Sequence, residues 1–161
     1  MSNCLCRHGS KRLDASLLLM PLVGFLPAAD PRIRGTLRAI EGRLLISGEF
    51  VRRYDTDNGT DGLPEGEGAF LACSFWLVDN YILQGRYAEA RKLFDGLISR
   101  CNDVGLLAEE FDPLTSRMLG NFPQAYSHVG LINCALNLSR QMGPRQAITW
   151  TRRNKSKRSD C

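Results

Sequence analysis

The sequence predicts an all-α protein of about five helices, arranged in antiparallel pairs with long loops at one end. Three observations support this fold class. Apolar residues recur at spacings of three and four, which places side chains on one face of a helix. A helix-start signal, Asp30-Pro31, precedes one of these runs, and stretches of turn-forming residues lie between them. The chain has 161 residues, 43% apolar and 24% charged, so it has room for one domain or for part of a larger one.

The first apolar run, Ala15–Leu26, follows a basic stretch that ends at Arg12. Two interpretations fit it: a short buried helix, or the apolar region of a secretory signal peptide followed by the small residues Ala28 and Ala29. The run is about a dozen residues long, which is shorter than the roughly 20 residues that a membrane-spanning helix needs. Composition alone leaves the two interpretations equal.

Asp30-Pro31 predicts the start of the next helix, because Asp accepts hydrogen bonds from the first turn and Pro suits the first helical position. Gly48 is expected to end this helix, whose apolar stripe contains Ile33, Leu37, Ile40, Leu44 and Leu45. Residues 52–68 are rich in turn formers and acids and predict a long exposed loop. Loops of this length in compact domains are often functional.

The segment Glu67–Gln84 is apolar on almost all sides and predicts a helix that is buried all round. We expect four other helices to give it barely enough cover, which suggests that part of the fold lies outside this chain. Arg86–Cys101 predicts a helix with one apolar and one charged face. Residues 105–121 predict a loop with a short strand pair that turns at Asp112-Pro113. The last helix runs from about Pro123 to Arg140, and four of its apolar residues are expected to face inward: Ala125, Val129, Ile132 and Leu136.

The formal net charge of +4 is carried by the two ends of the chain. Residues 1–13 contribute +3 and residues 145–161 contribute +5, which leaves −4 on the body between them. We therefore expect a basic N-terminal tail over 1–13 and a basic, disordered tail over 143–161. A basic tail can attract nucleic acid, but the acidic body offers no basic face to extend the contact, so we expect no nucleic-acid partner.

The six cysteines form no metal-binding pattern, because the chain has no Cys-x-x-Cys pair, and Cys4, Cys6 and His8 lack a fourth ligand. We expect buried thiols without disulfides, which suit a cytoplasmic location. Asp55 and Asp57 begin an alternation of acids that resembles a calcium loop, but the Gly and the final Glu of that motif are missing. A solvated acidic loop is the favoured explanation of these acids and a substrate-lining loop is the alternative, so we expect no metal and no cofactor.

The motif Leu106-Leu-Ala-Glu-Glu-Phe-Asp-Pro113 places two adjacent acids after an apolar lead-in. Acids at a strand end are usually exposed and inert, but this lead-in allows one side chain to project into a cleft beside the 52–68 loop. A single carboxylate can act as a general base. Glycoside hydrolysis needs two carboxyl groups, one on each face of the sugar.

Several spaced segments resemble glycoside hydrolase family 15, the glucoamylase-like family, in its bacterial branch. They are Arg52-Arg53-Tyr54, Glu67–Val78, Asn102–Pro113 and Gly120–His128. Leu17–Pro27 with Asp30-Pro31-Arg32 also matches the family pattern, which favours a buried helix over a signal peptide. The resemblance covers roughly residues 14–142. It implies the C-terminal part of an (α/α)6 barrel, about five of its twelve helices, and hydrolysis of terminal α-glucosidic bonds with inversion.

The resemblance also implies a general base. In the family this residue lies in a Ser/Ala-Glu-Gln/Glu-Phe/Tyr-Asp string, which falls on Glu109, with Glu110 as its structural neighbour. A base of this kind activates a water, while an acid about 6.5–9.5 Å away protonates the leaving oxygen.

Four residues are expected to bind substrate. The family's Arg-Tyr pair falls on Arg53 and Tyr54, and the forked guanidinium of Arg53 suits sugar hydroxyls. Asp57 and Glu67 are expected to line the pocket. For Tyr126 and His128, a pocket role and a core role both stay open.

The family's general acid belongs to a Trp-Glu motif, which this chain lacks, because Trp76 precedes Leu77 and Trp150 precedes Thr151. We therefore expect a truncated hydrolase that is inactive alone, acts on an α-glucoside or oligosaccharide, and has an N-terminal half of the same hydrolase as its partner. No membrane partner is expected. The alternative function is a non-catalytic helical module that binds protein or carbohydrate. The turn Gln84–Ala90 resembles a tetratricopeptide repeat, but nothing similar follows 34 residues later.

Overall fold

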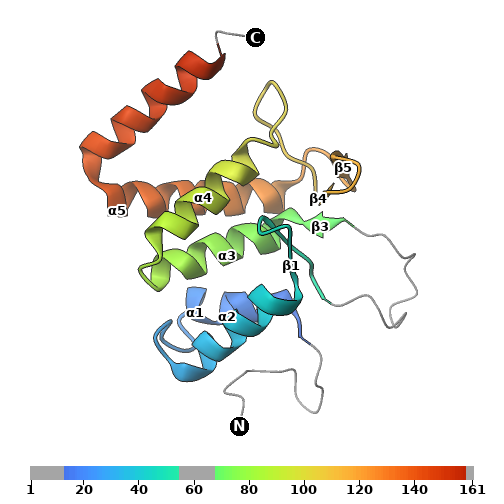
Figure 1. Cartoon of the computed structure of the whole chain (residues 1–161), viewed down its shortest axis with the longest axis vertical. Helices are drawn as coiled ribbons and strands as arrows, with labels where there is room; N and C mark the ends of the chain where they lie inside the picture. The colour runs from blue at the N-terminus through green and yellow to red at the C-terminus, as the bar shows by residue number, and fades with distance from the viewer. Residues whose placement is uncertain (1–12, 55–67, 159–161) are drawn as a thin grey trace.

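The computed structural model describes residues 13–54 and 68–158, with the backbone alone over 142–158. Its helices are arranged around a central helix, α3 (Leu71–Leu83). On one side of α3 lie the 3₁₀ helix Ala15–Leu18, α1 (Leu19–Leu22) and α2 (Pro31–Arg43). On the other side lie α4 (Tyr87–Ile98) and α5 (Ala125–Arg158) (Figure 1). The prediction of an all-α fold with about five helices is confirmed.

Two small antiparallel sheets lie close to the end at which α3 begins. In the first, β1 (Leu45–Ile46) pairs with β2 (Phe50–Val51). The second has the order β3-β4-β5, formed by β3 (Ala69–Phe70), β4 (Glu110–Asp112) and β5 (Arg117–Leu119). The β4–β5 pair confirms the strand pair expected within residues 105–121. Both sheets lie at one end of the helices (Figure 1).

The hairpin of β1 and β2 corrects the sequence prediction, which continued a helix through Leu45. Helix α2 ends at Arg43 instead. Ser47 and Gly48 follow with φ angles of 53° and 72°, and two successive positive φ values match the tight turns that join hairpin strands. The hairpin is fixed to α3, because the backbone N–H of Val51 donates to Ser74 Oγ at 2.9 Å.

The start of α3 also differs from the sequence prediction, which placed it at Glu67. Ala69 and Phe70 are extended and pair with β4, so the helix begins at Leu71. A Cβ on Gly68 would lie 3.0 Å from the carbonyl oxygen of Phe111. The missing side chain of Gly68 therefore allows the strand to approach β4 before the chain enters the helix.

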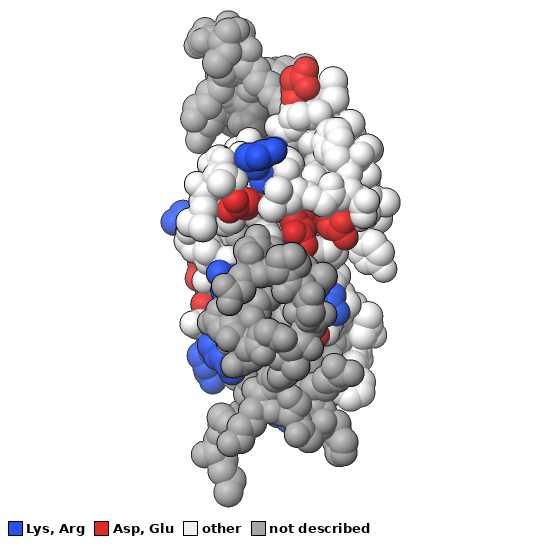
Figure 2. All heavy atoms as spheres, turned by 90° about the vertical axis from the view of Figure 1, so that its right-hand side faces the viewer, with Lys and Arg blue, Asp and Glu red and all other residues white. Residues whose placement is uncertain are grey.

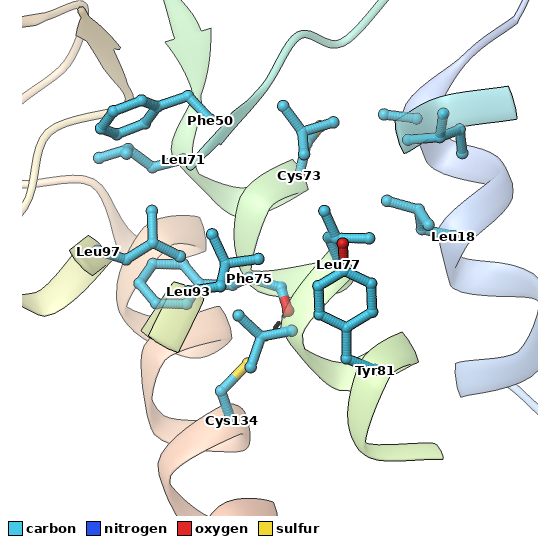
Figure 3. Close-up of a cluster of buried hydrophobic side chains, with 14 of the residues drawn as sticks. Leu18, Phe50, Leu71, Cys73, Phe75, Leu77, Tyr81, Leu93, Leu97 and Cys134 are labelled. Carbon is cyan, nitrogen blue, oxygen red and sulfur yellow. Dashed lines mark hydrogen bonds between the residues drawn. The ribbon is translucent and has the colours of Figure 1, made fainter. Parts of the chain in front are cut away.

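Eleven of the thirteen residues of α3 are buried, as its apolar sequence predicted. Figure 3 shows Leu93 and Cys134 against one side of this helix and Leu18 against the other. The β1–β2 hairpin and the 3₁₀ helix add to the cover that α4 and α5 provide for α3.

Buried polar side chains of α3 connect it to the elements on both sides. Asn80 Nδ2 donates to the carbonyl oxygen of Leu18 in the 3₁₀ helix at 2.8 Å. On the opposite side, Asp79 Oδ1 accepts from Asn137 Nδ2 of α5 at 2.9 Å, and Cys134 Sγ donates to the carbonyl oxygen of Phe75 at 3.1 Å. These bonds fix the neighbours of α3 relative to one another, because a buried polar group without a partner is costly.

The N-terminal apolar run is only partly in the core. Leu17, Leu18 and Pro21 are buried. The helix ends at Leu22 rather than near Leu26, and the side chains of Val23 and Phe25 that follow are exposed. Over the described residues, no helix combines the length and the apolar character needed to cross a membrane.

Helices α2 and α4 present the faces that their sequences predicted. Ile33, Leu37 and Ile40 of α2 are buried, as are Ala90, Leu93, Phe94 and Leu97 of α4. The predicted N-terminal signal of α2 is also present, since Asp30 Oδ1 accepts from the backbone N–H of Arg32 at 2.8 Å. The stripe predicted for α5 is different: Val129, Ile132 and Leu136 are exposed, while Cys134 and Leu138 are buried.

Stability should fall as pH rises from acid to neutral, because Asp79 is only 6% exposed. Burial raises the pKa of Asp79 above its ordinary value of 3.8, and the hydrogen bond from Asn137 acts in the opposite direction. The folded chain therefore binds this proton more tightly than the unfolded chain between the two pKa values, and the free energy of unfolding decreases with pH across that interval.

Asp79→Asn should reduce this decrease, since an amide keeps an acceptor for Asn137 and does not ionise. Urea unfolding of both chains from pH 4 to 8 measures the difference. Equal pH slopes for the two chains would show that Asp79 is not the cause.

Candidate active site

The backbone around Glu109 is fixed from two sides. Its N–H donates to the carbonyl oxygen of Asn121 at 2.9 Å, and its own carbonyl oxygen accepts from Leu71 N–H, the first residue of α3, at 3.0 Å. Glu109 directly precedes β4, so its Cα position is set by the sheet and by the start of α3 together. A residue held in this way has little freedom to move with the loops around it.

The carboxylate of Glu109 is half-buried and is oriented by a single neighbour. Its Oε2 accepts from the side-chain Nδ2 of Asn121 at 2.9 Å and from the backbone N–H of the same residue at 3.2 Å. Within the described residues, Oε1 has no hydrogen-bond partner. One oxygen is therefore anchored and the other is available, which is the arrangement that a general base needs.

Gly120 makes room for this carboxylate. A Cβ at position 120 would lie 2.9 Å from Oε2 and 3.0 Å from the Cβ of Glu109. Gly120 also has a φ of +73°, which disfavours any residue with a side chain. Asn121 and Gly120 both contact the Glu109 side chain, and the sequence did not single them out, although both lie in the Gly120–His128 segment.

The segment before Glu109 is attached to the first turn of α5. Ser127 Oγ donates to the carbonyl oxygen of Ala108 at 2.7 Å. His128 Nε2 accepts from the N–H of Leu107 at 3.3 Å, and its Nδ1 lies 2.7 Å from the carbonyl oxygen of Gln124. Both ring nitrogens are thus used within the protein, which favours a structural role for His128 over a pocket role. Tyr126 is instead exposed.

Arg53 is attached to the same end of α3 from the opposite side. Its Nε lies 3.1 Å from Asp14 Oδ1, and its guanidinium carbon lies 5.9 Å from the centre of the Trp76 ring. The backbone holds this segment as well, because Ala15 N–H donates to the carbonyl oxygen of Arg53 and Asp14 pairs with Tyr54 as an isolated bridge. In the described part of the chain, no hydrogen bond or ion pair joins Arg53 to Glu109.

Of the other residues that the sequence predicts to bind substrate, some lie outside the described residues and one lies within them. Asp57 and Glu67 lie outside the described residues, as do the acids of the calcium-like pattern. Tyr54 is half-buried beside Arg53. Figure 2 faces the end of the molecule that carries β4 and β5, and its upper half shows acidic and basic side chains among uncharged residues.

The buried thiols offer no reactive group at this end. Burial raises the pKa of Cys73 to about 12, although the charge of Arg53 acts in the opposite direction. Its thiol therefore stays protonated at neutral pH, whereas nucleophiles and metal ligands are thiolates. Among the described residues, no group of three or more His, Cys, Asp or Glu side chains is placed to hold a metal ion.

Comparison with known proteins places these features in a family. A model described as glycosyl hydrolases family 15 matches residues 2–136. The trehalase of Thermoplasma acidophilum is 46% identical over 131 residues, which are 81% of this chain and 22% of that protein. The trehalase of Mycolicibacterium smegmatis is 47% identical over 134 residues, 83% of this chain and 20% of that protein. The chain thus spans about a fifth of the length of these relatives.

Solved structures agree on the fold. A wild-type glycosidase superposes with a TM-score of 0.68 at 22% identity, over 86% of this chain and 39% of its own. A glycosidase variant in complex with glucose gives a TM-score of 0.69 at 21% identity, with the same coverage. The fold is a partial (α/α)6 barrel, in agreement with the sequence-based expectation. With its family match and its relatives, the chain belongs to glycosyl hydrolases family 15 and represents the C-terminal part of that domain.

Proposed function

We propose that this chain supplies the general base, Glu109, and part of the sugar-binding surface of an inverting hydrolase of terminal α-glucosidic bonds. The observation that carries the proposal is the state of the Glu109 carboxylate. Asn121 anchors Oε2, while Oε1 has no partner among the described residues. A water held at Oε1 would lose its proton to the carboxylate as its oxygen attacks the anomeric carbon.

Inversion also needs a general acid on the opposite face of the sugar. The chain has no Trp-Glu sequence to provide the family's acid. We assign that role to a residue of the N-terminal half of the same hydrolase, which makes this chain inactive by itself. The two parts together would have the paired carboxyl groups that glycoside hydrolysis requires.

Trehalose is the first substrate to test, because the related proteins at 46% and 47% identity are trehalases. It is an α-glucoside, so its hydrolysis fits the reaction proposed from the site. Maltose and isomaltose are the matched comparisons, since they carry the terminal α-linkages on which the glucoamylase-like reaction acts.

The experiment combines this chain with the trehalase of Thermoplasma acidophilum from which the matching segment has been removed. We expect glucose release from trehalose by the combination and none by either part alone. Absence of glucose release from all three disaccharides, by a combination that is shown to have associated, would contradict the proposed function.

Arg53 is proposed to bind the sugar through the nitrogen atoms that Asp14 does not occupy. Arg53→Lys should raise KM for the disaccharide about tenfold, since one forked donor is worth about 1.4 kcal/mol, with little change in kcat. Steady-state kinetics of the combined enzyme measure both constants.

Arg52→Lys is the matched control for this prediction, one residue earlier in the same segment, and should leave KM unchanged. An unchanged KM in Arg53→Lys, or an equal rise of KM in both variants, would show that Arg53 does not bind the sugar.

A further inference from the structure

Helix α5 carries an apolar stripe on its outer side. Tyr126, Val129, Ile132 and Leu136 follow one another at spacings of three and four, and their exposed fractions are 65%, 56%, 60% and 48%. Residues at these spacings lie on one face of a helix. Four large apolar side chains on one face make a continuous patch, whereas single exposed apolar residues are ordinary. We call these four residues the α5 stripe.

The segment of sequence that carries the α5 stripe contains no charged residue. From position 125 to position 139, the sequence contains no Asp, Glu, Lys or Arg. The outward faces of the other long helices are different: α2 exposes Arg34 and Arg38, and α4 exposes Glu89 and Lys92. Depletion of charged residues distinguishes the core of a protein interface from ordinary surface, so α5 differs from α2 and α4 in the way that an interface helix does.

The opposite face of α5 is already occupied. Ser127, Gly130, Cys134 and Leu138 are buried, and a Cβ on Gly130 would lie 2.8 Å from the Cβ of Phe75 on α3. Helix α5 cannot rotate its outer face inward without losing this close contact. A helix that is apolar on two faces is covered on both in a complete fold.

We propose that the α5 stripe is the docking surface for the N-terminal helices of a family 15 hydrolase, supplied as a separate chain or segment. This inference rests on the proposed function, because it names the partner that would complete the same site. The size of the fold supports this occupant: the chain superposes on 39% of a solved glycosidase at a TM-score of 0.68, so more than half of that fold has no counterpart here.

The location of the stripe supports the same occupant. Tyr126 begins it and is adjacent to Ser127, which bonds the carbonyl oxygen of Ala108 directly before Glu109. Gln124 N–H donates to the carbonyl oxygen of Leu107 at 3.0 Å in the same place. A partner seated on α5 therefore lies beside the segment that carries the base, where a second carboxyl group is needed.

The test co-expresses this chain with the Thermoplasma acidophilum trehalase lacking the matching segment, and measures co-purification and Kd. We expect a one-to-one complex. Ile132→Lys and Leu136→Lys should each raise Kd about thirtyfold, the effect of losing one central interface residue. Leu83→Lys is the matched control, because Leu83 has the same chemistry and a 50% exposed fraction beside 48% for Leu136, and it should leave Kd within about twofold.

Circular dichroism and thermal unfolding of each free variant should match the wild type, since the substituted side chains are exposed. Absence of a complex, or equal weakening by Leu83→Lys, would overturn the proposal. So would self-association of this chain that Ile132→Lys abolishes while the shortened trehalase does not bind, because a second copy would then be the occupant.

Failure of the interface and failure of the proposed function give different results. A complex that depends on Ile132 but releases no glucose would support the docking surface and contradict the proposed function. Glucose release that requires Glu109 but is unaffected by Ile132→Lys and Leu136→Lys would support the proposed function and contradict the docking surface.

Discussion

Replacing Glu109 by Gln should lower glucose release by the combined enzyme about a thousandfold, within the range that a general base contributes. Gln keeps the size of the side chain and an oxygen that can accept from Asn121, which donates to Oε2 at 2.9 Å and 3.2 Å. The amide cannot take a proton from water. The expected loss is therefore in kcat, with KM nearly unchanged.

Glu110→Gln provides the control for this substitution. It makes the same chemical change one residue later, in the β4 strand, whose neighbouring side chains point to opposite faces. Activity within about threefold of the wild type is expected from Glu110→Gln. Equal losses of activity in Glu110→Gln and Glu109→Gln would show that Glu109 is not the base.

Gly120→Ala should reduce kcat about a hundredfold, because a catalytic group displaced by about 1 Å loses roughly that factor. The new methyl group would lie 2.9 Å from Glu109 Oε2, so either the carboxylate or the turn must move. The positive φ of Gly120 adds a conformational cost of about 1–2 kcal/mol for a residue with a side chain.

Gly105→Ala separates the two causes. Gly105 has a φ of +83°, similar to the +73° of Gly120, but a Cβ there would meet nothing within 4 Å. The free energy of unfolding, measured with urea, should fall by a similar amount in both variants. The value of kcat should fall only in Gly120→Ala. Equal kcat in the two variants would show that Gly120 does not position the carboxylate.

The sequence was sufficient for the helices whose two faces differ. In α2 and α4, charged residues alternate with apolar ones at helical spacing, and the buried faces are the predicted ones. The short strands were not predictable in the same way. Leu44-Leu45-Ile46 is an apolar run that fits a helix or a strand, and the choice depends on the turn at Ser47 and Gly48 and on the bond from Val51 to Ser74.

The error on α5 has a related cause. Its sequence is apolar at Val129, Ile132 and Leu136 and also at Cys134 and Leu138, so spacing alone does not tell which face packs on α3. The small residue Gly130 decides it, because α3 approaches so closely that a Cβ at this position would overlap Phe75. An outward apolar face is unexpected in a closed domain and is expected where a further surface must be covered.

The candidate site was predictable where family motifs carry it and not where contacts cross between segments. Glu109 and Arg53 come from motifs. Asp14, which pairs with Arg53, lies 39 positions earlier in a segment without a motif. Asn121 acts on Glu109 only because β4 and β5 return the chain to the same place.

Chemical rescue of Glu109→Ala in the combined enzyme tests the central claim most directly. With α-glucosyl fluoride as substrate, azide can occupy the space of the lost carboxylate and its bound water, attack the anomeric carbon and displace fluoride. We expect azide to raise fluoride release by at least about tenfold and to yield β-glucosyl azide, identified by NMR. No increase with azide, or an α-configured product, would contradict the assignment of Glu109 as the base of an inverting hydrolase.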